Sequence, residues 1–263
     1  MRYLAVIAAF LFVLAGSVWA TDKWDYATPN DDTAATTQNV LWHTAGPQTH
    51  DLQYNTTDGD DQDWFKIFPR QYRSYEVQML NITGSVALAP TDFQRYNSTG
   101  TTVLQNGGSL DPSGRTMALR WVATANTEER IRVWGYSFND YYSQYDIQLL
   151  ETTLYCPRWN QAGTQTSVLI LQRTGASIVA ASCTGHAYFF DEGSVLLADY
   201  PFTMDTLNDV DVYSLAGISG LPTHKGGAMI AHDCGYGGIA AKLVALEPST
   251  GFSFDTWCSW LPR

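Results

Sequence analysis

Short apolar segments of strand length alternate with turn-forming residues along almost the whole chain. Two clear turns are Asp111-Pro-Ser-Gly114 and Asp191-Glu-Gly-Ser194, each between apolar runs, and the second is typical of a β-hairpin loop. No segment has the i, i+3, i+4, i+7 apolar stripe of a long amphipathic helix, and only residues 32–40 favour a helical turn or two. The many Trp and Tyr residues also favour strands, because aromatic side chains are enriched in strands. We therefore expect an all-β fold.

The expected strands cover residues 63–68, 75–80, 85–90, 116–124, 130–135, 145–151, 166–173, 185–191, 195–200, 209–215, 227–232 and 239–246. A turn-rich stretch at 152–163 interrupts them, and no cysteine precedes it. We expect two β-sandwich domains of jelly-roll or immunoglobulin-like type in tandem, at 21–152 and 153–263.

The first 20 residues predict export. Arg2 gives a positive start, and an apolar run of 12 residues follows from Leu4 to Ala15. This run is too short for a bilayer core, which needs about 20 residues. Val18 and Ala20 lie where signal peptidase prefers small residues, so we expect a signal peptide at 1–20, a mature protein starting at Thr21 and no membrane span after cleavage.

All four cysteines lie in the C-terminal part of the chain, at Cys156, Cys183, Cys234 and Cys258. An even number in an exported protein predicts two disulfides. A zinc site is the alternative, but structural zinc ligands usually come in close pairs, which are missing here. Three pairings are open; the sequence favours Cys156–Cys258 enclosing Cys183–Cys234.

The net charge of −11 disfavours nucleic acid as a partner, because nucleic-acid binding needs a basic patch and none is visible.

The N-terminal half resembles the bacterial pre-peptidase C-terminal (PPC) domain, a β-sandwich of exported proteins. The resemblance rests on Thr28-Pro-Asn-Asp31, on Asp60-Asp-Gln-Asp-Trp-Phe65, and on Ile131-Arg-Val-Trp-Gly135 followed by Tyr145-Asp-Ile-Gln-Leu149. The family has Glu where this chain has Thr28. The C-terminal half resembles an uncharacterised domain of bacterial secreted proteins through segments at Thr166, His232 and Ala245, which implies no activity.

The PPC resemblance also implies a calcium site. In calcium-binding relatives the opening motif folds onto the strand start, and the matching positions are Asn30, Asp31, Asp61 and Asp63. Calcium binds about six to eight oxygen atoms, which acidic loops can supply. The alternative is two solvated turns in which Asp and Asn cap the backbone.

The segment His232-Asp-Cys-Gly-Tyr-Gly-Gly238 is the one that most resembles a catalytic site, because a cysteine nucleophile needs a nearby histidine. A disulfide at Cys234 would remove the nucleophile. We find no serine-hydrolase elbow, phosphate-binding loop or dinucleotide fingerprint.

Aromatic residues crowd the stretch after residue 133, and we predict that Trp134, Tyr136, Tyr141 and Tyr142 bind a ligand. Rings on loops of a rigid scaffold often stack on sugars or peptides. The alternative is that these rings cover the edge of the sandwich.

Together these features predict a non-catalytic binding or surface-display protein that is secreted or lies on the cell surface. The expected partner is a polysaccharide, another extracellular polymer or a cell surface. Two alternatives stay open: a small secreted hydrolase with a PPC-like accessory domain, and a structural subunit of an extracellular assembly.

Overall fold

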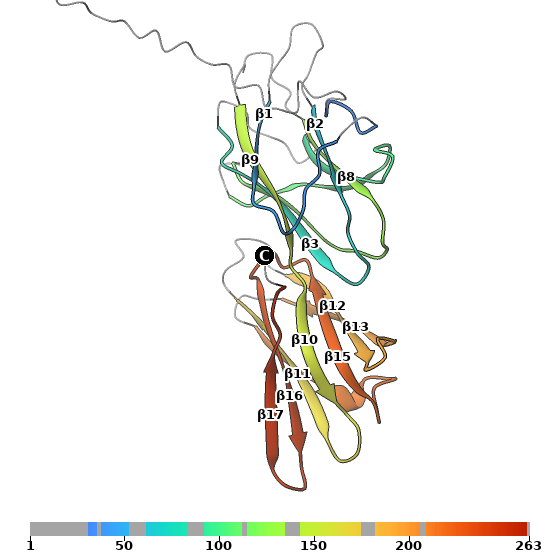
Figure 1. Cartoon of the computed structure of the whole chain (residues 1–263). Coiled ribbons are helices and arrows are strands. Elements are labelled where there is room, and N and C mark those ends of the chain that lie inside the picture. The colour runs from blue at the N-terminus through green and yellow to red at the C-terminus, as the bar shows by residue number, and fades with distance from the viewer. Residues whose placement is uncertain are drawn as a thin grey trace, which may run out of the picture.

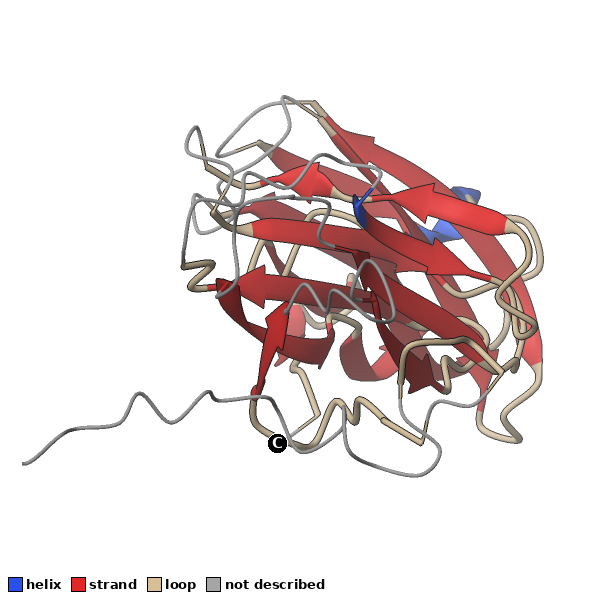
Figure 2. Cartoon of the chain, turned by 90° about the horizontal axis from the view of Figure 1, so that it is seen from above, coloured by secondary structure: helices blue, strands red, loops and turns tan. Residues whose placement is uncertain are grey.

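A computed structural model of the chain describes residues 31–35, 38–52, 62–83, 92–111, 115–134, 143–174, 182–205 and 209–261. The predicted signal peptide lies outside the described residues. The described chain is all-β, as predicted, and consists of strands joined by short loops (Figure 2). Among the described residues, no helix is long and apolar enough to cross a membrane.

In the described part of the chain before residue 152 the strands are β1 (Gln48–Leu52), β2 (Gln62–Ile67), β3 (Ser74–Leu80), β4 (Phe93–Tyr96), β5 (Val103–Asn106), β6 (Gly108–Ser109), β7 (Met117–Val122), β8 (Glu129–Trp134) and β9 (Ser143–Glu151). They form two antiparallel sheets, in the orders β1-β9-β3-β7-β6 and β2-β8-β4-β5. Alternate side chains of both sheets build one buried core, which includes Phe65, Val77, Leu119, Ile131 and Ile147. This is the packing expected of a β-sandwich.

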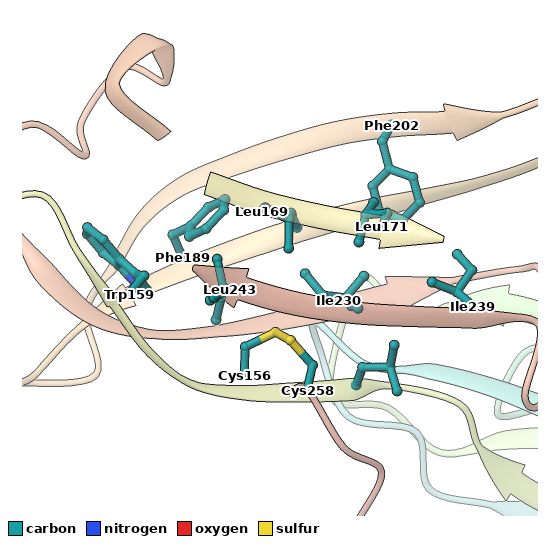
Figure 3. Close-up of a cluster of buried hydrophobic side chains, with 14 of the residues drawn as sticks. Cys156, Trp159, Leu169, Leu171, Phe189, Phe202, Ile230, Ile239, Leu243 and Cys258 are labelled. Carbon is teal, nitrogen blue, oxygen red and sulfur yellow. A yellow bond between two sulfur atoms is a disulfide. The ribbon is translucent and has the colours of Figure 1, made fainter. Parts of the chain in front are cut away.

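The remaining strands are β10 (Leu154–Asn160), β11 (Thr166–Arg173), β12 (Cys183–Asp191), β13 (Leu196–Met204), β14 (Val210–Ser214), β15 (Lys225–His232), β16 (Ile239–Glu247) and β17 (Phe252–Trp257), with a short 3-10 helix, η2 (Leu215–Gly217). Their sheets have the orders β10-β15-β12-β13 and β14-β11-β16-β17. A second core lies within this half, built around Trp159, Leu169, Phe189, Ile230 and Leu243 (Figure 3).

Two disulfides staple the second half: Cys156–Cys258 and Cys183–Cys234. This is the pairing that the sequence favours, and it excludes a zinc site built on these sulfurs. The Cys156–Cys258 bond lies beside the apolar core (Figure 3) and joins strand β10 to the end of the chain.

Strand β11 has the predicted bounds, and the turn from Asp191 to Ser194 connects β12 and β13 as a hairpin. Two expectations were wrong. The stretch 152–163 is not mainly turn, because β10 occupies most of it; Pro157 is accommodated where the β10–β15 register shifts between Cys156 and Trp159. The described part of 32–40 holds bends and a turn but no helix.

Strands of the two halves form separate sheets and separate cores, and Figure 1 shows β1 to β9 and β10 to β17 as two groups along the chain. Specific contacts nevertheless join them. The Tyr72 ring lies 4.9 Å from that of Tyr188 and 5.8 Å from that of Phe190, measured between centroids. The backbone N–H of Tyr236 donates to the buried carboxylate of Glu76. The division into domains at 152/153 stays a prediction.

Candidate functional site

A buried polar cluster forms where the first described segment meets strand β2. The carbonyl of Asp31 accepts a hydrogen bond from the N–H of Trp64 at 3.0 Å, and the carbonyl of Asn39 accepts one from Lys66 at 2.7 Å. These bonds lay the segment along β2. Asp31 therefore lies beside Asp63, the arrangement that the PPC resemblance implies.

Three residues of this cluster, Asp31, His50 and Asp63, each offer an atom within 4.8 Å of the others. Their exposures are only 2%, 1% and 0%. The Asn39 side chain links them: its amide nitrogen donates to Asp31 Oδ2 at 3.2 Å and lies 3.4 Å from His50 Nε2. The hydroxyl of Tyr145, on β9, donates to the carboxylate of Asp63. Two carboxylates this close and this buried need a compensating cation or proton.

The cluster fits a calcium ion in part. Asp31 and Asp63, two of the four predicted ligands, come together, whereas Asn30 and Asp61 lie outside the described residues. Carboxylate oxygens suit calcium, but an imidazole nitrogen is typical of zinc and other transition metals. His50 Nε2 also lies 3.2 Å from Gln48 Oε1, so the ring has polar neighbours besides the carboxylates.

His50 and Tyr145 are members of this cluster that sequence reasoning missed. His50 stands in β1 and Tyr145 in β9, and these strands pair with each other at this point. Only the pairing of distant segments brings them to Asp63. No spacing in the sequence signals it.

The predicted aromatic surface is only partly described. Trp134 ends β8 and is half-buried, with the Arg132 guanidinium 5.1 Å from its ring centroid. Tyr136, Tyr141 and Tyr142 lie outside the described residues. Tyr145, which follows them, is a core residue with 2% exposure and not part of an exposed aromatic loop.

The segment at His232 does not form a thiol–imidazole pair, because Cys234 is bonded to Cys183. His232 is buried, and burial lowers its pKa to about 4; the nearby Arg120 charge acts in the same direction, and the neighbouring Thr152 backbone opposes both. Asp233 has a structural role: its carboxylate accepts hydrogen bonds from the N–H and hydroxyl of Thr184, at 2.6 and 2.9 Å.

The second half carries a surface cavity of about 540 Å³ beside the Cys156–Cys258 disulfide. This volume lies within the range of small-ligand sites, about 300–1,000 Å³. Aromatic rings, polar groups and a glycine line it together. The lining residues are Tyr155, Cys156, Pro157, Phe190, Asp191, Ser194, Gly227, Ala228, Met229, Trp257 and Ser259.

Gly227, on β15, keeps part of this cavity open. A Cβ atom built there would lie 3.4 Å from the carbonyl oxygen of Cys156 and 3.8 Å from that of Pro157, which are ordinary contacts. A larger side chain would therefore fit the backbone but occupy cavity space. The indole of Trp159 donates to the Gly227 carbonyl at 2.9 Å and fixes this strand from the core side.

The polar wall comes from the β12–β13 hairpin. Asp191 Oδ1 accepts the N–H of Val195 at 2.8 Å, and the backbone of Asp191 closes the turn with Val195 at 3.0 Å. Ser194 adopts a φ of 65°, a left-handed conformation that is uncommon for a serine and positions it at the rim. The hairpin thus holds a carboxylate and a hydroxyl beside the aromatic rings.

No protein-family model matches the chain, and neither does any curated protein. Among solved structures, the full extracellular region of zebrafish Gpr126/Adgrg6 is similar at a TM-score of 0.26 and 10% identity, over 85% of this chain and 31% of that one. The chain thus spans about a third of that protein's length. At this score the likeness carries no argument about fold or function.

Proposed function

We propose that this is an exported, non-catalytic binding or display protein, and that the cavity beside the Cys156–Cys258 disulfide binds a sugar unit of an extracellular polysaccharide. The observation that carries the proposal is the composition of the cavity lining: the aromatic residues Tyr155, Phe190 and Trp257 line the same space as Gly227, which has no side chain to fill it.

Sugars have an apolar ring face and a rim of hydroxyl groups. Aromatic side chains suit the first, and a few fixed polar groups suit the second. Here Asp191, Ser194 and Ser259 line the same space as the rings, and the carbonyl oxygens of Cys156 and Pro157 flank Gly227. The two disulfides hold this half rigid, which lowers the ordering cost of binding.

Calcium is the cofactor that we propose for the N-terminal half. Asp31 and Asp63 would hold the ion, with Asn30 and Asp61 completing the shell. Its role would be structural: it would neutralise two buried carboxylates and tie the opening segment to β2.

Affinity electrophoresis of the full mature chain tests the sugar proposal, with hydroxyethylcellulose, xylan, glycol chitin and dextran as the polymers in the gel. We expect retardation by one of them, lost in Gly227→Leu. The matched control is Gly217→Leu, because a Cβ at Gly217 meets nothing within 4 Å and this residue is not among those that line the cavity. Migration that no polymer changes, or equal retardation of both variants, would contradict the proposal.

A further inference from the structure

On the outward face of the β14-β11-β16-β17 sheet, residues that pair between neighbouring strands form rows across the sheet. Residues directly opposite in an antiparallel ladder share a face. The central row runs Val212, Ile170, Lys242, Trp257 across the four strands. The alternate positions Leu169, Leu171 and Leu243 are buried in the core, so this row points away from it. Figure 1 shows β11, β16 and β17 side by side.

This face is unusually apolar for one that meets solvent. Val210, Val212 and Trp257 are 52%, 61% and 66% exposed. The partly exposed Val168, Ile170 and Val244 lie between them. A solvated face of an antiparallel sheet normally carries polar residues, and a contiguous apolar patch marks an interaction surface.

The charge on the face is balanced. At its outward positions these four strands carry two charged residues, Lys242 and Asp255, which form an ion pair at 2.6 Å. The whole chain has a net charge of −11. Two copies would repel over most of their surfaces, but this neutral face allows them to approach.

The size of the face suits a modest interface. Three strand spacings of about 4.8 Å make the face roughly 15 Å wide; at about 3.4 Å per residue it is roughly 30 Å long at β11 and β16 and roughly 17–20 Å long at the shorter edge strands β14 and β17. Two such faces bury on the order of 1,000 Å² in total once side-chain relief is included, the lower range of specific interfaces.

We propose that a second copy of this chain packs against this face, forming a symmetric dimer with sheets face to face. The face has its largest side chain at one edge, Trp257 on β17, and small ones at the other, Val210 and Val212 on β14. A two-fold axis parallel to the strands sets each β17 edge over the β14 edge of the other copy. Trp257 then covers the valines of the second copy, and the contact is self-complementary.

This inference does not depend on the sugar proposal. Trp257 also stands at the rim of the cavity, so each test uses a residue that belongs to one surface only: Gly227 for the cavity and Val212 for the sheet face.

Sedimentation velocity of the full mature chain, from about 1 to about 300 µM, tests the dimer. We expect a dissociation constant below about 100 µM for the native chain, raised at least about 100-fold in Val212→Glu, because the new carboxylate would be buried without a partner. Val195→Glu is the matched control: Val195 is 58% exposed but lies in the β12–β13 turn. The Val195→Glu variant should dimerise with the dissociation constant of the native chain.

Both valines are exposed, so each variant should fold, and near-ultraviolet circular dichroism checks this. Val210→Glu provides a second disruption at the same edge. A native chain that stays monomeric at every concentration, or a dimer that Val212→Glu and Val195→Glu affect equally, would overturn the proposal.

Discussion

The carboxylate of Glu76 accepts a hydrogen bond from the backbone N–H of Tyr236 at 2.5 Å, although 160 positions separate them in the sequence. Glu76 is completely buried and also pairs with Arg120 at 3.0 Å. One buried acid thus holds a strand of the first half, its charge partner and a loop of the second half together.

We expect Glu76→Gln to destabilise the mature protein by about 3–5 kcal/mol, because it leaves Arg120 without its buried countercharge. Glu192→Gln is the control. It removes an exposed ion pair with Lys225, and such pairs contribute about 0–1 kcal/mol. Urea denaturation measures both. Equal, small losses would show that Glu76 does not stabilise the junction.

His232 should make stability depend on pH. Burial lowers its pKa from 6.5 to about 4, so between these values the folded protein keeps the ring neutral while the unfolded chain binds a proton. Stability therefore falls as pH falls through this window, by up to about 1.4 kcal/mol per unit, and this contribution levels off below it. We expect His232→Gln to flatten that slope in urea titrations. An identical slope in both proteins would contradict the assignment.

Removing either disulfide should be costly. Cys156–Cys258 closes 102 positions and Cys183–Cys234 closes 51, which correspond to about 4–5 kcal/mol in the chain-entropy model. We expect the double alanine variant of each pair to unfold at lower urea concentration, with the larger loss of stability for the Cys156–Cys258 pair.

Intact mass spectrometry should show a chain starting at Thr21 with no alkylatable thiol. A thiol in the unreduced protein would contradict the pairing.

Calcium should raise the melting temperature of the mature protein by several degrees at about 100 times its dissociation constant, since binding the folded state alone adds about 2.7 kcal/mol. Asp63→Asn should abolish the rise. The His50→Asn variant distinguishes calcium from zinc. Stabilisation by calcium should persist in it, because oxygen atoms bind that ion, whereas stabilisation by zinc should be lost together with the imidazole ligand. Identical melting in calcium and in chelator would argue against a calcium site.

Strands with a short apolar run bounded by turn residues were predictable from sequence, as the Val-Leu-Ile-Leu run of β11 shows. Strand β10 was not, since its Cys-Pro-Arg-Trp run is typical of a turn, and only the register shift against β15 accommodates the proline. Strand β17 was not predicted, because its residues are mostly exposed and form no buried face.

The candidate sites were less predictable than the strands. Motif order indicated Asp31 and Asp63, but His50 joins them through the pairing of β1 with β9. The cavity depends on Tyr155, Phe190, Gly227 and Trp257, which four different strands supply. Local sequence carries no signal for such a meeting of distant segments.

Chemical-shift mapping on the isotope-labelled mature protein tests the central claim most directly, with an oligosaccharide of the polymer that retards it in the gel. We predict that the backbone amides of Gly227 and Phe190, which both line the cavity, shift with saturation, and that Gly227→Leu abolishes the change. Saturable shifts that spare both groups, or turnover of the oligosaccharide during the titration, would contradict a non-catalytic sugar-binding cavity.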